Sequence, residues 1–126
     1  MRGMYGLPKD IDLSFFVGNT LNVVSFAVNV IHLNFDGGVC INIESSFQHH
    51  QQHDVELHQI GTLQSMHGIQ ASSLMQLAGH SVITAVGTEV GTLTLTFDHG
   101  HVLHCLDDLQ GYECYNFTDG ERLWVV

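Results

Sequence analysis

Residues 93–115 constrain the fold more than any other stretch of the chain. Leu93, Leu95 and Phe97 alternate with three threonines, and this period of two indicates a strand with one apolar face. An Asp-His-Gly turn follows, in which Gly100 can take the positive φ that hairpin loops often need. A second alternating run follows the turn, and a third comes directly after it. The stretch therefore predicts an antiparallel β-meander.

The rest of the chain predicts further strands and little helix. We expect strands over residues 21–28, 30–35, 39–43, 55–60, 82–86, 112–117 and 123–126. One or two helical turns are expected over residues 10–18, and a short helix capped by Ser72 or Ser73 and closed by Gly79. Residues 44–54 read as a polar loop rich in histidine and glutamine. The predicted class is mainly β with one or two short helices, an α+β fold.

The two halves of the sequence resemble each other. A Phe-Val-Gly segment ending at Gly18 matches Leu-Ala-Gly ending at Gly79, and a Phe-Asp-x-Gly segment ending at Gly38 matches one ending at Gly100. We expect a single domain, residues 1–126, with an internal repeat of about 10–60 and 71–126. Two such copies would pack their apolar faces together as an open barrel or a pair of sheets. Ordinary hairpin chemistry explains the same matches without duplication.

The charge balance excludes several classes of partner. Thirteen acidic residues face three basic ones, for a net charge of −10. A negative surface repels polyanions, so we expect neither nucleic acid nor an anionic membrane as a partner. The same charge favours fast association with a basic protein, although many proteins are acidic for solubility alone.

The cysteines and the N-terminal segment bear on the compartment. Cys40, Cys105 and Cys114 form no metal-ligand or redox spacing, which favours reduced thiols in a reducing compartment. The first residues contain no apolar signal segment, and no apolar run is long enough to span a bilayer. We therefore expect a cytoplasmic protein.

Ten histidines invite a metal interpretation, but their spacing does not support one. His101 and His104 differ by an odd number, so on a strand they point to opposite faces. Together with Asp54 and His58, the loop residues His49, His50 and His53 could hold a divalent ion loosely, but they lack the ligand spacing of a structural zinc site. We expect no metal site and no cofactor.

Catalytic signatures are also missing from the sequence. Asp107, Asp108, Glu113 and His104 are acid–base groups close together in the chain, yet nothing resembles a nucleophile elbow, a phosphate-binding glycine loop or a cofactor fingerprint. Glu113 beside Cys114 would raise the pKa of the thiol and make it a poor nucleophile. We expect a protein that is not an enzyme.

The same region supplies the candidate binding surface. An acid beside aromatic residues is typical of recognition surfaces. The predicted surface consists of Asp107, Asp108, Tyr112, Glu113 and Tyr115. The alternative is that the tyrosines belong to the core, with their hydroxyls bonded to backbone at a strand corner and Glu113 at the sheet rim.

Three motifs carry a resemblance to a known group. Residues 4–18 (MYGLPKDIDLSFFVG), 91–98 (GTLTLTFD) and 112–115 (YECY) resemble a widespread bacterial family of small proteins of unknown function. Members of that family commonly carry Tyr-Glu-Ser-Tyr at the last motif. Cys114 replaces the serine here, so a role that needs the hydroxyl is not expected. More distantly, the Asp-x-Gly hairpin followed by this motif looks like immunity proteins that neutralise polymorphic toxins, which implies a tight protein-binding role.

These observations lead to three readings of the function. The first is a non-enzymatic binding protein, an immunity-like inhibitor of a basic toxin or nuclease. The second is a small-molecule or nucleotide-derivative binding module that acts as a homo-oligomer, although the scarcity of Lys and Arg disfavours phosphorylated ligands. The third is a homodimer with a structural role, paired through an open edge strand.

Overall fold

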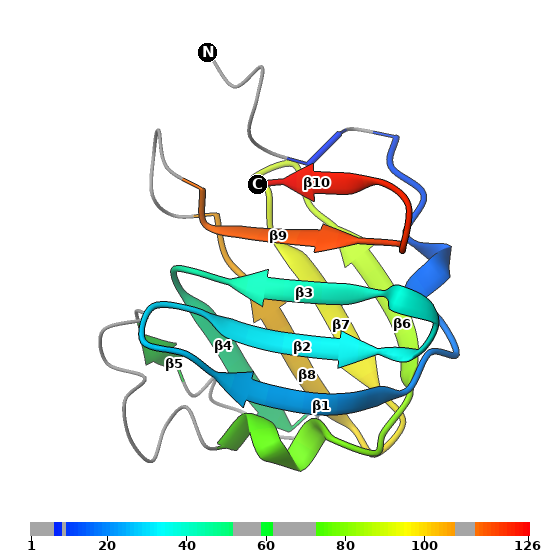
Figure 1. The fold of residues 1–126 in the computed structure, drawn as a ribbon, viewed down its shortest axis with the longest axis vertical. Helices are drawn as coiled ribbons and strands as arrows, with labels where there is room; N and C mark the ends of the chain where they lie inside the picture. The colour runs from blue at the N-terminus through cyan, green and yellow to red at the C-terminus, as the bar shows by residue number, and fades with distance from the viewer. Residues whose placement is uncertain (1–6, 9, 52–58, 62–72, 108–112) are drawn as a thin grey trace.

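The computed structural model describes residues 7–8, 10–51, 59–61, 73–107 and 113–126, and these form two five-stranded antiparallel sheets (Figure 1). The first sheet has the order β1 (Leu21–Phe26), β2 (Ile31–Phe35), β3 (Cys40–Ile43), β9 (Tyr115–Thr118) and β10 (Leu123–Val125). The second has the order β5 (Gln59–Gly61), β4 (Phe47–Gln51), β8 (His101–Cys105), β7 (Leu93–Phe97) and β6 (Val82–Gly87). Within these ranges no helix has the length and apolar character needed to cross a membrane.

The sheets lie face to face, with strands that cross rather than run parallel (Figure 1). The alternating residues predicted from the sequence form the core between them, and Leu33 on β2 and Leu95 on β7 are fully buried. Burying one such side chain stabilises the fold by about 1.5–3 kcal/mol. The mainly-β prediction is confirmed, and the sheets do not close into a barrel.

The predicted α+β character is not confirmed, because the described helical segments are short 3-10 turns. These are η1 (Ser14–Phe16), η2 (Asp36–Gly38) and η4 (Ser73–Leu77). Gly18 and Gly79, both with positive φ, follow η1 and η4 almost at once and turn the chain into a strand.

Two strands differ from the sequence prediction. β4 occupies part of the stretch predicted to be a polar loop, because Phe47 and His49 point into the core and pair along β8. β9 does not complete the predicted meander, because it leaves the second sheet and pairs with β3 of the first. Residues 52–54 of the predicted loop and residues 55–58 of the predicted strand lie outside the described residues.

Each sheet thus combines three consecutive strands from one half of the chain with two from the other. From the first half, β4 pairs with β8 and β5 pairs with β4. From the second half, β9 pairs with β3 and β10 pairs with β9. The two sheets are tied at β1 and β6, where the Gly18 N–H donates to the Val82 carbonyl and the Gly79 N–H donates to the Leu21 carbonyl, both at 2.7 Å.

Candidate functional site

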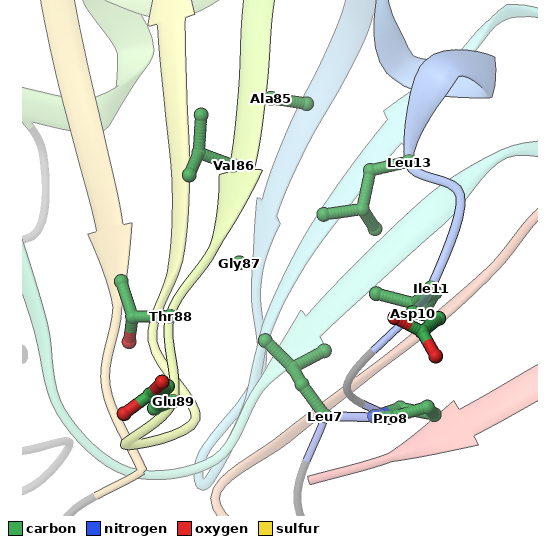
Figure 2. A pocket seen from close by; sticks show the side chains of 10 residues that line it. All are labelled: Leu7, Pro8, Asp10, Ile11, Leu13, Ala85, Val86, Gly87, Thr88 and Glu89. Atoms are coloured by element: carbon green, nitrogen blue, oxygen red, sulfur yellow. The ribbon is translucent and has the colours of Figure 1, made fainter.

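An open hollow of about 710 Å³ lies between the N-terminal segment and the end of β6 (Figure 2). One wall is formed by residues of the segment that precedes η1, and the facing wall by the end of β6 and the link to β7. The lining residues are Leu7, Pro8, Asp10, Ile11, Leu13, Ala85, Val86, Gly87, Thr88 and Glu89.

The floor of the hollow is apolar and depends on a glycine. A Cβ atom added to Gly87 would lie 3.0 Å from Cδ1 of Leu7 and 3.5 Å from Cδ1 of Leu13. The bare backbone therefore lets both leucines approach β6 closely, as Figure 2 shows. Leu13 is buried and Leu7 partly buried against the core, so the floor is continuous with the interior of the protein.

The rim of the hollow is acidic. Asp10 on the N-terminal segment and Glu89 on the β6–β7 link are exposed on opposite walls (Figure 2). The described lining contains no lysine, arginine, histidine or cysteine. An apolar floor with a carboxylate rim suits a group with an aliphatic stem and a positive end, such as an arginine or lysine side chain.

A smaller hollow of about 430 Å³ shares Pro8, Asp10 and Ile11 with the first, and Arg122 is one of its lining residues. Arg122 lies over the ring of Trp124, 4.9 Å from its centroid, and donates to the Asp119 carboxylate at 3.0 Å. This surface can therefore hold a guanidinium between an aromatic ring and carboxylates.

Of the predicted surface residues, the structure describes Asp107, Glu113 and Tyr115, and these three do not form one exposed surface. Asp108 and Tyr112 lie outside the described residues. Asp107 is half-buried, its carboxylate lies against Gly91, and it accepts a weak hydrogen bond from the Cys114 thiol at 3.5 Å. Asp107 therefore borders the β6–β7 link, the same link that carries Glu89.

Tyr115 is a core residue, so its prediction as part of an exposed surface is wrong. Its side chain is fully buried, and its hydroxyl donates to the Gly91 carbonyl at 2.7 Å. Burial raises the pKa of the phenol. The residue ties the start of β9 to the β6–β7 link, because a buried hydroxyl needs a hydrogen-bond partner and finds one in the link.

Glu113 has a partner that sequence reasoning missed. The side-chain amide of Asn116 donates to Glu113 and also to Glu44 Oε2 at 3.3 Å. A hydrogen bond with Glu113, reinforced by burial and by the negative charge of Glu113, raises the pKa of Glu44 to about 7. The two carboxyl groups are far apart in the sequence and meet because β3 pairs with β9.

A row of polar side chains extends from this pair across the outer face of the first sheet. Asn42 donates to Asn116 Oδ1 at 2.8 Å, and the ring of His32 donates to Asn42 Oδ1 at 2.6 Å. The row fixes the orientation of Asn116 and through it the position of both glutamates. The described members of the row are amide, imidazole and carboxylate groups.

The histidines on β4 and β8 form two pairs on opposite faces of the second sheet. His49 and His101 are buried and share a hydrogen bond of 2.7 Å, whereas His50 and His104 share one of 3.1 Å on the outer face. Burial, followed by the charge of His101, lowers the pKa of His49 to about 4. The prediction that His101 and His104 point to opposite faces is confirmed.

Fold and site together define a two-sheet β protein with an acid-rimmed apolar hollow on its surface. The chain belongs to DUF6188, a family of unknown function whose model matches residues 13–126. The predicted resemblance to a family of unknown function is confirmed to that extent. Neither a curated protein nor a solved structure matches the chain significantly. The match includes the β6 wall of the hollow and, from the opposite wall, Leu13.

Proposed function

We propose that the protein is a non-enzymatic binding protein that holds a basic segment of a partner protein in the acid-rimmed hollow. The observation that carries the proposal is the combination of an apolar floor with Asp10 and Glu89 on facing walls and no basic residue in the described lining. The floor would receive the aliphatic stem of an arginine or lysine, and the rim its positive charge.

The charge of the whole chain supports the same partner. A net charge of −10 attracts a basic surface over distance, and the rim then selects its orientation. The packing of Arg122 between Trp124 and Asp119 in the adjacent hollow is an intramolecular example of the proposed contact.

The more specific form of the proposal is an immunity-like inhibitor that covers the basic surface of a toxin or nuclease in the cytoplasm. Its support is the acidic surface together with three cysteines that remain thiols, as expected in a reducing compartment. If the gene lies beside a toxin-like reading frame, co-expression should rescue growth from the toxin, and Glu89→Lys should abolish the rescue. Rescue that is unaffected by Glu89→Lys would contradict the use of this hollow.

Calorimetric titration with a basic peptide such as nona-arginine tests the hollow directly. Glu89→Gln should weaken binding about threefold to tenfold, because it removes one rim carboxylate. Glu121→Gln removes the same charge from the exposed β9–β10 turn and should have a smaller effect. Gly87→Val fills the floor without changing the charge and should also weaken binding. Equal effects of Glu89→Gln and Glu121→Gln would show attraction by net charge alone.

The second candidate is a small-molecule binding module that acts as a homo-oligomer. The volume of the hollow favours it, because about 710 Å³ lies in the usual range for small ligands. The acidic rim favours an organic cation over a nucleotide derivative. Edge strands β1 and β6 expose Val23, Phe26, Ile83 and Val86, which would suit contact between copies of the chain. Thermal-shift measurements with arginine, agmatine and nucleotides, together with light scattering, separate this candidate from the first.

We also infer that the two halves of the chain arose by duplication. The exchange of two strands between the sheets is reciprocal, and bulges fall at equivalent places, between Leu21 and Val23 on β1 and between Val82 and Thr84 on β6. If the inference holds, the two halves of other family members should match at the same positions, Gly18 with Gly79 and Gly38 with Gly100.

A further inference from the structure

Three potential metal ligands converge where the β7–β8 turn meets the segment before β6. They are His80, Asp98 and His99, and one ligand atom from each lies within 4.8 Å of the others. His80 Nδ1 is 2.8 Å from Asp98 Oδ1, and His99 Nδ1 is 3.9 Å from the same oxygen. None of these residues lines the hollow of the proposed function.

His99 is oriented as metal-binding histidines usually are. Its Nε2–H donates to the backbone carbonyl of Gln76 at 3.1 Å, which leaves Nδ1 with a lone pair. That Nδ1 atom is buried and has no hydrogen-bond partner among the described residues. Ligating imidazoles commonly donate their other N–H to a carbonyl in this way, and an ion would satisfy a buried atom that is otherwise costly to leave unpaired.

Asp98 is also held in place. Its Oδ2 accepts the backbone N–H of Ser81 at 3.3 Å, and its own N–H donates to the Ser81 carbonyl at 2.9 Å. These bonds fix the carboxylate and leave Oδ1 directed at the histidines. The hydrogen bond from His80, followed by that from Ser81, lowers the pKa of Asp98, so the group is an anion at neutral pH.

His80 is the ligand that has to move. Its ring is stacked on that of His99, with centroids 3.6 Å apart and planes 4° apart. Because each lone pair lies in the plane of its ring, one ion cannot meet both lone pairs while the rings are parallel. The side chain of His80 is 36% exposed, so it has room to tilt until both imidazoles can form Zn–N bonds of about 2.0–2.1 Å.

We propose that His80 Nδ1, Asp98 Oδ1 and His99 Nδ1 form a binding site for a zinc-class divalent transition-metal ion. The ion takes the place of the proton between His80 and Asp98, which moves to His80 Nε2. Two imidazoles and one carboxylate favour such an ion over calcium or magnesium, which prefer oxygen ligands. Three protein ligands leave a coordination position for solvent or for a group of a partner.

The chain contains a comparable turn without the histidines. In the β2–β3 turn, Asp36 accepts from Asn22 at its carboxylate and from Asn19 at its backbone carbonyl, and Gly37 follows it. Asn19 directly follows Gly18 as His80 follows Gly79, and Gly37 directly precedes Gly38 as His99 precedes Gly100. The first turn therefore retains the aspartate but offers no imidazole.

Calorimetric titration of the purified full chain with zinc chloride tests the site. His80→Ala and His99→Ala should each remove one equivalent of bound zinc or weaken it at least about tenfold. His32→Ala, on the outer face of the first sheet, is the matched control and should leave that equivalent unchanged. If neither His80→Ala nor His99→Ala changes the affinity or the stoichiometry, the proposal is wrong.

Long-range proton–nitrogen NMR spectra of the imidazoles give a second readout that does not depend on a variant folding. Added zinc should shift the Nδ1 resonance of His99 while its Nε2 remains protonated. The His80 resonances should also lose the ring-current shift caused by stacking on the ring of His99. Zinc that binds tightly without changing the His99 Nδ1 resonance would place the ion elsewhere and overturn the assignment. Binding only at millimolar zinc would overturn it too.

Discussion

The two sheets have similar inner faces and different outer faces. Inside, equivalent positions carry equivalent apolar residues, such as Leu33 on β2 and Leu95 on β7. Outside, the first sheet carries a row that ends in Glu44 and Glu113, whereas the second carries Thr94, His104 and His50. The inner faces determine the fold, and the outer faces are free to differ in charge and in response to pH.

The largest effects should come from the inner faces, where the sheets are alike. Leu33→Ala and Leu95→Ala should each lower the free energy of unfolding by about 2–5 kcal/mol, since both side chains are fully buried and leave a cavity. Denaturant titration measures both. A difference of more than about 2 kcal/mol between the two variants would show that the sheets are not energetically equivalent.

The second sheet should become less stable as the pH falls. Folding lowers the pKa of His49 from 6.5 to about 4, so its contribution to stability is complete above 6.5 and is lost as the pH falls toward 4. We expect a loss of up to about 3 kcal/mol over this range. His49→Phe should flatten this part of the curve of unfolding free energy against pH. An unchanged slope in the variant would assign the acid sensitivity to other groups.

One equivalent position of the inner faces carries Tyr115 in the first sheet and Phe47 in the second, and these side chains differ by a single hydroxyl. Tyr115 pairs with Ile43 in the first sheet, and Phe47 pairs with Cys105 in the second. Tyr115→Phe should cost about 1–3 kcal/mol, because it leaves the Gly91 carbonyl without its donor. Thermal unfolding checks the value, and a neutral result would mean that solvent replaces the lost bond.

The first sheet should show a smaller pH effect of the opposite sign. The pKa of Glu44 rises from 4.5 to about 7 on folding, so the stabilisation is complete below 4.5 and is lost as the pH rises through 7. Glu44 is largely exposed to solvent, which limits the effect to below about 1 kcal/mol. Glu113→Gln should reduce the slope between these pH values, whereas Glu121→Gln should not. Equal slopes in the unmodified protein and in both variants would show that Glu113 does not influence the ionisation of Glu44.

The sequence predicted what depends on local periodicity. The alternation of Leu93, Leu95 and Phe97 correctly placed a strand and its buried face. β4 was missed because histidine usually marks a polar segment, yet His49 is buried through its bond to His101. The placement of β9 beside β3 depends on pairing between segments that are distant in the sequence, and no local pattern indicates that pairing.

The candidate site was less predictable than the fold. The pairing of Glu113 with Glu44 and the burial of Tyr115 follow from the register of β9, which the sequence does not encode locally. The hollow joins residues of the 4–18 motif to residues 85–89, and nothing in that motif indicates which strand it packs against. His80 and His99 are also distant in the sequence, and their rings meet only because the β7–β8 turn lies beside the segment before β6.

The exchange of strands between the sheets has a consequence for synthesis on the ribosome. β9 and β10 follow all the other strands in the sequence, yet they complete the sheet that begins with β1. The nascent chain must therefore leave the edge of β3 open until β9 and β10 have been synthesised. Co-translational folding would stop at a half-built intermediate, and an early stop codon would remove strands from the sheet that was begun first.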